Sequence, residues 1–280
     1  MKNFFKNSAK SIGLIVLYLL VQGLVVLGVM LFYVKFVDGF WTDLVNAIDN
    51  DFASNTVNAA SMAVMGRILV PSMLISDLLI TIPVVLFSKK KKDKIIKKIQ
   101  INKFFIIVLL SLGLNIIIDL LLNFVPSDIL SSYQELMSVT DGMAFWQQML
   151  IIGILAPIVE ELLFRYAFIR PFRNYKPKLL KCSGVTVGIV LSAISFGIAH
   201  GNIVQSSYAF VLGLILGYIY TRDFNLSESI LMHITINSSS LILGALKAPY
   251  SYVMMGMMLI SFVVSVFLIV MEKKRCKNKL

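Results

Sequence analysis

Eight long runs of predominantly apolar residues limit this chain to a small set of folds. They span approximately 12–34, 68–87, 104–125, 147–168, 183–200, 205–220, 227–246 and 250–271. A helix needs about 20 apolar residues to cross the hydrocarbon core of a bilayer. Because lipid cannot bond backbone polar groups, a spanning segment must satisfy them internally, as a helix does. The sequence therefore predicts an all-α polytopic membrane protein, a bundle of eight transmembrane helices.

The composition excludes an ordinary soluble domain. Hydrophobic residues make up 58% of the chain and charged residues 15%, and the mean hydropathy is +0.85. Soluble domains average about 45–50% apolar and about 25% charged residues. The first run is also longer than the roughly 7–15 apolar residues of a signal peptide, so we expect 12–34 to be a transmembrane span.

Basic residues gather in segments that an eight-span bundle would place on one side. They occur before the first run, in 89–103, in 170–181, at Arg222 and after Met271. The positive-inside rule then predicts that both termini are cytoplasmic. This bias accounts for the net charge of +11. A nucleic-acid partner is not expected, and we expect the basic segments to border anionic lipid headgroups.

Three polar clusters interrupt the apolar runs. Glu160 and Glu161 precede Arg165 in one run, and the only two histidines, His200 and His233, lie in two others. An ionisable side chain at bilayer depth costs about 2.5 kcal/mol or more on insertion scales, so it usually faces an interior cavity and marks function. The clusters therefore predict one active site built from three helices.

The spacing within the first cluster suggests a division of roles. Arg165 lies four residues after Glu161 on the same helical face and can pair with it. Glu160 points about 100° away around the helix, which makes it the candidate general base. The alternative interpretation is an ion-paired helix end with a structural role.

The histidine clusters point to hydrolysis. His233 and Asn237 share a helical face, and hydrogen-bond donors placed in this way can stabilise the oxyanion of a tetrahedral intermediate. Phe196 shares a face with His200 in the same way. Either histidine alone would be read as a satisfied core residue. The serines at 238–240 lack the GxSxG context of a serine nucleophile.

The ordered set EExxxR, FxxxH and HxxxN, each on its own apolar segment, resembles the CPBP intramembrane proteases. That family comprises CAAX prenyl endopeptidases and bacteriocin-processing or bacteriocin-immunity (Abi) proteins. The resemblance covers roughly 147–246 and implies a similar eight-helix bundle. It divides the chain into an N-terminal transmembrane region (1–146), a catalytic core of four spans (147–246) and a last span with a basic cytoplasmic tail (247–280).

Carried over by position, the resemblance implies a role for each cluster. Glu160 would activate water together with His200. Glu161 and Arg165 would orient the catalytic carboxylate. The reaction would be hydrolysis of a peptide bond by glutamate-activated water.

The resemblance also implies that His233 and Asn237 form the oxyanion pocket and that no cofactor is needed. A zinc site with Glu161, His200 and His233 as its three protein ligands is the alternative. The HExxH signature of zinc proteases is absent, and the metal-free, glutamate-dependent mechanism is the one we expect.

The expected function is an endopeptidase of a bacterial plasma membrane that cleaves a membrane-associated peptide or protein. The sequence does not identify the substrate, the cleavage site or the oligomeric state. A proton- or ion-coupled transporter is an alternative, because Asp77 and Asp119 also lie within predicted spans. A non-catalytic bacteriocin-immunity protein is another.

The depths in the bilayer that residue counting gives for the clusters conflict with a single shared site. At 1.5 Å per residue, Glu160 and His233 count out roughly 10 Å from the cytoplasmic boundary. His200, near the end of the run 183–200, counts out much closer to the outer face.

Overall fold

The computed structural model of the chain describes residues 2–54, 59–90, 95–173, 183–245, 256 and 259–266. All regular secondary structure in these residues is helical, as predicted. The elements are α1 (Lys2–Phe36), α2 (Phe40–Ser54), α3 (Ala59–Lys90), α4 (Ile101–Leu122), α5 (Ser127–Ser138), η1 (Val139–Gly142), α6 (Phe145–Gln148), η2 (Met149–Leu155), α7 (Ala156–Glu160), η3 (Glu161–Ala167), η4 (Arg170–Phe172), α8 (Gly184–Ala199), α9 (Ile203–Asp223) and α10 (Leu226–Ala245).

Four helical segments are long and apolar enough to cross a membrane: Ser8–Phe36, Val64–Val84, Ile101–Leu122 and Ile203–Asp223. They coincide with the first, second, third and sixth predicted runs. The run 183–200 forms the shorter apolar helix α8, and 227–246 forms α10. The run 147–168 is helical but divided into the consecutive segments α6 to η3. The last predicted run, 250–271, lies mostly outside the described residues.

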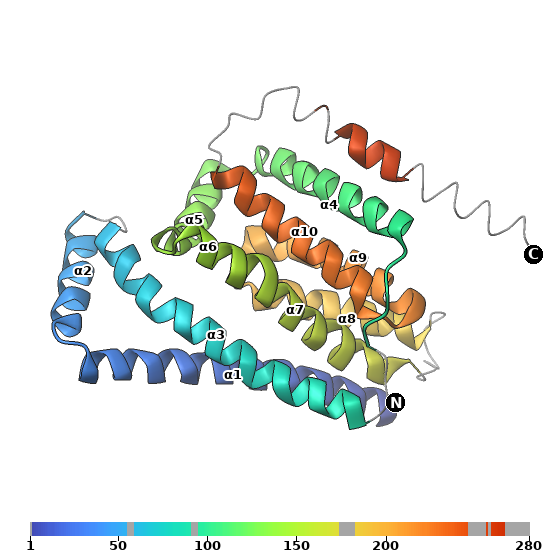
Figure 1. Ribbon diagram of the computed structural model, residues 1–280, viewed down its shortest axis with the longest axis horizontal. Helices are drawn as coiled ribbons and strands as arrows, with labels where there is room; N and C mark the ends of the chain where they lie inside the picture. The colour runs from blue at the N-terminus through green and yellow to red at the C-terminus, as the bar shows by residue number, and fades with distance from the viewer. Residues whose placement is uncertain are drawn as a thin grey trace, which may run out of the picture.

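The long helices run roughly alongside one another, and α10 lies in the middle of the bundle (Figure 1). It packs against α4, α9 and the α7–η3 segment, while α3 packs against α1 and α7. The buried face of α10 includes Ser229, Met232, His233, Ile236 and Ser239. This spacing of three and four residues keeps one side of the helix inside the bundle.

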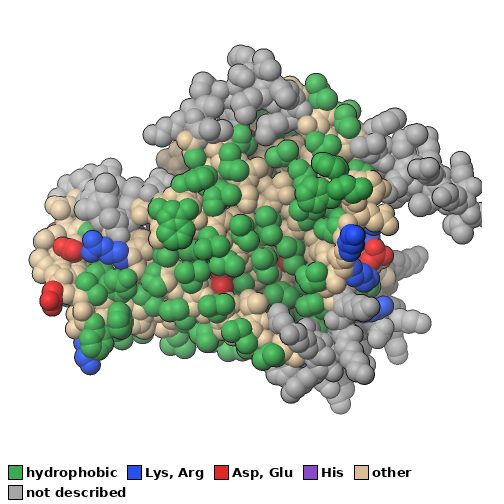
Figure 2. Space-filling model, viewed as in Figure 1, with side chains coloured by type: hydrophobic (Ala, Val, Ile, Leu, Met, Phe, Trp, Pro, Cys, Tyr) green, Lys and Arg blue, Asp and Glu red, His purple; other side chains and the backbone are tan. Residues whose placement is uncertain are grey.

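The surface is that of a protein embedded in lipid. Hydrophobic side chains cover the middle of the face in Figure 2, and most charged side chains lie toward its two ends. Large apolar side chains such as Leu24 and Ile198 are 68% and 72% exposed. Contiguous apolar surface of this extent is rare on soluble monomers. Together with the four candidate spans, it indicates a membrane protein.

The connecting segments divide between the two ends of the bundle (Figure 1). The N-terminus, residues 95–100 and the α9–α10 junction lie at one end, where the Leu226 N–H donates to Ile95 O at 2.9 Å. The helices α2 and α5 lie toward the other end, and α2 occupies much of the polar loop 35–67. Three of the predicted basic segments therefore meet at one end.

The helices α8 and α9 approach closely because α9 carries Gly213 and Gly217. A Cβ atom added at Gly213 would lie 2.9 Å from the Cα of Ala193, and one at Gly217 would lie 3.0 Å from Ile189 Cγ2. The GxxxG spacing of these two glycines thus serves close helix packing.

We expect Gly213→Ala to destabilise the bundle by about 1–3 kcal/mol, because the added methyl group meets a backbone atom that cannot rotate away. Thermal unfolding in detergent measures the effect. Gly23→Ala is the matched control, since nothing lies within 4 Å of a Cβ at that position in α1. Equal melting temperatures for the two variants would contradict the proposed tight contact.

Candidate active site

The helix that carries the two glutamates is widened on both sides of them. The segments η2 and η3 are π-helical, and the five residues of α7 separate them. In η2 the Ala156 N–H donates to Ile151 O, five residues earlier, and at the end of η3 the Phe168 N–H donates to Leu163 O. Such π-segments occur frequently at functional sites. They place Glu160 and Glu161 at the junction of α7 and η3.

Glu161 and Arg165 form an ion pair that is closed off from solvent. Arg165 Nε lies 3.2 Å from Glu161 Oε2, and both side chains are 0% exposed. Neither of these two atoms has a partner in hydrogen-bond geometry, so the contact is electrostatic. Arg165 Nη1 donates to Ser192 Oγ at 3.4 Å, and the guanidinium stacks over the Phe196 ring at 4.7 Å. The pairing that the four-residue spacing predicts is present.

His233 joins the two glutamates. Its Nδ1 lies 3.1 Å from Glu161 Oε1, and its Nε2 lies 3.5 Å from Glu160 Oε2. The carboxylate of Glu161 accepts a hydrogen bond, so the tautomer with a proton on Nδ1 fits this contact. Nε2 then carries the lone pair and faces Glu160. The sequence associated His233 with Asn237 and did not predict its contact with both carboxylates.

Glu160 differs from Glu161 in its access to water. The Glu160 side chain is 21% exposed, whereas Glu161 is fully buried. Of the two adjacent carboxylates, one is therefore paired and enclosed and the other is open. Their different directions around the helix predict this difference in environment.

His200 lies next to this group across an aromatic ring. The Phe196 ring contacts His200 edge-to-face at 4.8 Å and His233 at 5.7 Å. His200 Nδ1 donates to Phe196 O at 2.6 Å, which leaves Nε2 free to accept a proton. The two histidines thus flank one ring, and the contact of Glu160 with an imidazole is made by His233.

The contacts of His200 place it with this group, although the length of α8 agrees with the residue count. The helix has 16 residues and ends at the cap residue His200. At 1.5 Å per residue it extends about 24 Å. The Phe196 ring nevertheless lies between His200 and His233 and contacts both.

Asn237 lies on α10 and faces the helical run that carries the two glutamates. Its Nδ2 donates to Ile152 O in η2 at 3.0 Å, and the neighbouring Ser238 Oγ donates to Gly153 O at 3.2 Å. An amide nitrogen carries two hydrogens, so one N–H of Asn237 remains for another acceptor.

Two residues outside the predicted motifs also approach Glu160. Asp77 on α3 is 6% exposed, and its Oδ2 has no hydrogen-bond partner. It lies within electrostatic range of Glu160, as does Tyr18 on α1. The position of Asp77 in an apolar run was the signal that could have found it. Asp119, the other intramembrane aspartate, lies instead near Tyr208.

Two of the three alternative zinc ligands, Glu161 and His233, are in contact, and His200 lies on the other side of the Phe196 ring. Among the described residues, no group of three His, Cys, Asp or Glu side chains is placed to hold a metal ion. In this arrangement the two carboxylate oxygens of Glu161 face Arg165 and His233.

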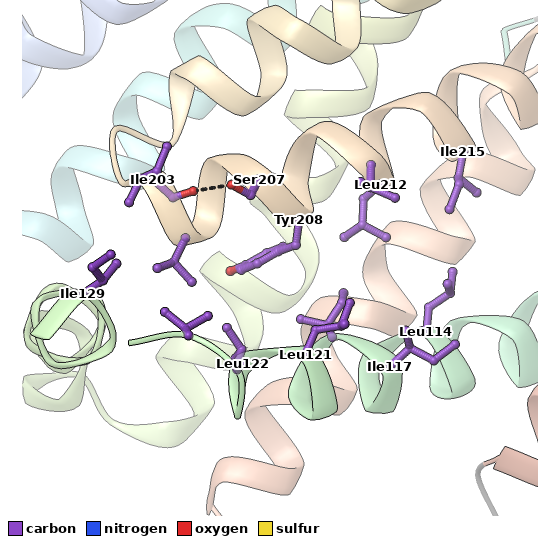
Figure 3. A pocket seen from close by; sticks show the side chains of 14 residues that line it. Leu114, Ile117, Leu121, Leu122, Ile129, Ile203, Ser207, Tyr208, Leu212 and Ile215 are labelled. Carbon is purple, nitrogen blue, oxygen red and sulfur yellow. Dashed lines mark hydrogen bonds between the residues drawn. The ribbon is translucent and has the colours of Figure 1, made fainter. Parts of the chain in front are cut away.

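An apolar pocket of about 440 Å³ lies between α4, the start of α5 and α9 (Figure 3). Its lining includes Leu114, Leu121, Ile203 and Leu212, and its hydroxyl groups have partners within the protein. Ser207 Oγ donates to Ile203 O at 2.7 Å. Tyr208 bonds Tyr133 at 3.3 Å and packs against the core cluster that contains Phe196. The pocket suits a hydrocarbon group, and none of the six predicted site residues lines it.

Comparison with known proteins agrees with the motif resemblance. Residues 142–239 match the Rce1-like family, described as type II CAAX prenyl endopeptidase Rce1-like, which belongs to the CPBP family. The matched segment contains all six predicted site residues. No curated protein and no solved structure matches the chain. The resemblance to the CPBP family is confirmed over this segment, which points to a protease of the CAAX type.

We expect Arg165→Gln to destabilise the protein by about 3–5 kcal/mol, because it leaves the Glu161 carboxylate buried without its cation. Unfolding in mixed detergent micelles measures the loss. The double variant Glu161→Gln/Arg165→Gln removes both charges and should recover most of the stability. A double variant as unstable as the single one would show that Arg165 acts through packing.

Proposed function

We propose that this chain, whose residues 142–239 match the Rce1-like family model, is a glutamate-dependent intramembrane endopeptidase. The observation that carries the proposal is the unequal environment of two adjacent carboxylates. Glu161 is enclosed by Arg165 and His233, while Glu160 is partly open and also contacts His233. An enclosed, neutralised carboxylate can hold neighbouring side chains in position, and an open one can accept a proton from water.

The proposed reaction begins with a water molecule between Glu160 and the carbonyl carbon of the substrate peptide bond. Glu160 accepts a proton from this water, and the water oxygen bonds to the carbonyl carbon. The carbonyl oxygen becomes an oxyanion, and the free N–H of Asn237 donates to it. Glu160 then returns the proton to the amide nitrogen as the carbon–nitrogen bond breaks. A new carboxyl group and a new amine are released.

The histidines support the proton transfers. His233 Nε2 faces Glu160 at 3.5 Å and can exchange a proton with it. His200, with Nδ1 bonded to Phe196 O, presents Nε2 as a further acceptor for the attacking water. The ion pair of Glu161 and Arg165 holds His233 in its orientation, because Glu161 Oε1 accepts from Nδ1.

The proposed setting is a bacterial plasma membrane crossed eight times, with both termini in the cytoplasm. The basic segments at one end of the bundle support this orientation under the positive-inside rule. A membrane-associated peptide or protein is the proposed substrate. The apolar pocket beside Tyr208 supports that choice, since it could receive a hydrophobic part of such a substrate.

Glu160→Gln should abolish hydrolysis, because an amide cannot accept the proton of the attacking water. The purified protein in nanodiscs is incubated with a library of membrane-anchored peptides in H₂¹⁸O, and mass spectrometry reads the new carboxyl termini. Wild type should incorporate ¹⁸O at one preferred bond.

Glu135→Gln is the matched control, because Glu135 is exposed on α5. It should behave as wild type. Undiminished ¹⁸O incorporation by Glu160→Gln would remove Glu160 from the role of base.

We propose further that the reaction needs no metal ion. Exhaustive dialysis of the nanodisc-embedded protein against a strong chelator should then leave the rate of cleavage unchanged. Elemental analysis before and after dialysis accompanies the assay. Loss of cleavage that returns on adding zinc would instead support a metal mechanism and the alternative assignment of Glu161, His200 and His233.

A further inference from the structure

Pro157 lies inside the helical run that carries the two glutamates. Proline has no backbone N–H and cannot donate within a helix. One carbonyl group loses its donor as a result. The neighbouring Ala156 N–H reaches back five residues to Ile151 O, so in this register the carbonyl group facing position 157 is Ile152 O. A carbonyl group inside the bundle without a donor is costly, so Ile152 O requires a partner from elsewhere.

Two consecutive residues of α10 donate hydrogen bonds to Ile152 O and to the adjacent Gly153 O. Asn237 Nδ2 donates to Ile152 O at 3.0 Å, and Ser238 Oγ donates to Gly153 O at 3.2 Å. The glycine is needed for this approach, because a Cβ atom at Gly153 would lie 3.0 Å from Ser238 Oγ. The carbonyl group left without a donor by Pro157 and the backbone of Gly153 thus both lie against the same turn of α10.

The acceptor also decides which end of the Asn237 side chain faces η2. The oxygen and nitrogen of a carboxamide are similar in shape, and the hydrogen-bond network assigns them. A carbonyl oxygen can only accept, so the amide nitrogen must face Ile152 O. One N–H is thereby used, and the position of the second N–H is set by the plane of the carboxamide.

We propose that Pro157 is a positioning residue for Asn237: the carbonyl that the proline leaves without a main-chain donor anchors the carboxamide and directs its second N–H toward the reacting carbonyl. The inference rests on the proposed function, in which Asn237 binds the oxyanion. It adds a physical reason for the position of the second Asn237 N–H. Pro157 itself touches neither substrate nor reacting atoms.

The test restores the missing donor. In Pro157→Ala, the new N–H competes with Asn237 for Ile152 O, so the carboxamide loses its anchor. We expect kcat to fall about tenfold with KM unchanged, since the lost interaction forms only in the transition state. Pro83→Ala is the matched control, an exposed proline inside α3, and it should leave kcat unchanged.

A double-mutant cycle separates positioning from general damage. Asn237→Ala should lower kcat by roughly 10²–10³, and Pro157→Ala/Asn237→Ala should lower it no further, because both changes remove one interaction. Full kcat in Pro157→Ala, or losses that multiply in the double variant, would overturn the proposal. Pro157→Leu restores the same N–H and serves if the alanine variant fails to fold.

An experimental structure of the Pro157→Ala protein in nanodiscs gives a readout independent of activity. Asn237 Nδ2 released from Ile152 O supports the inference, even if the protein proves not to be a hydrolase. Retention of that hydrogen bond beside a new one from the backbone N–H introduced at position 157 overturns it. An inactive Asn237→Ala with an unchanged Pro157→Ala structure would leave the proposed function standing and remove only the role of Pro157.

Discussion

The enclosed ion pair of Glu161 and Arg165 is the contact on which the arrangement of the site depends. Two opposite charges without solvent exposure are tolerated only when they stay together. To keep them together, η3 must face α8, where Ser192 and Phe196 meet the guanidinium. It must also face α10, where His233 Nδ1 donates a hydrogen bond to the Glu161 carboxylate. One electrostatic requirement thus brings the three motif-bearing helical segments into contact.

The same requirement separates the two adjacent glutamates. Because Glu161 is committed to Arg165 and His233, Glu160 turns toward the part of the bundle that α1 and α3 cover, where it comes within range of Tyr18 and Asp77. The N-terminal helices therefore contribute polar groups near the site, although their sequences carry no motif. Asp77, first noted as a possible element of a proton pathway, belongs spatially with Glu160.

Part of this arrangement could be predicted from particular residues. The spacing of Glu161 and Arg165 predicted their pairing, and the polar clusters predicted that three helical segments meet. The contact of His200 with the Phe196 ring beside His233 could not be predicted by counting, because a count along one helix does not give its tilt or its offset from its neighbours. The π-helical turns were also missed, since the donors that meet the carbonyl groups of η2, Asn237 and Ser238, come from the distant helix α10.

Sequence alone determined the class of the protein. Apolar runs in a chain with few charges admit only a helical membrane protein, and polar clusters inside such runs have to face its interior. Only the tertiary structure decided which imidazole contacts which carboxylate and which amide N–H is already used. Those contacts join residues far apart in the chain, such as Glu161 and His233. Local periodicity specifies the face on which a side chain lies, whereas the packing of the neighbouring helix specifies its partner.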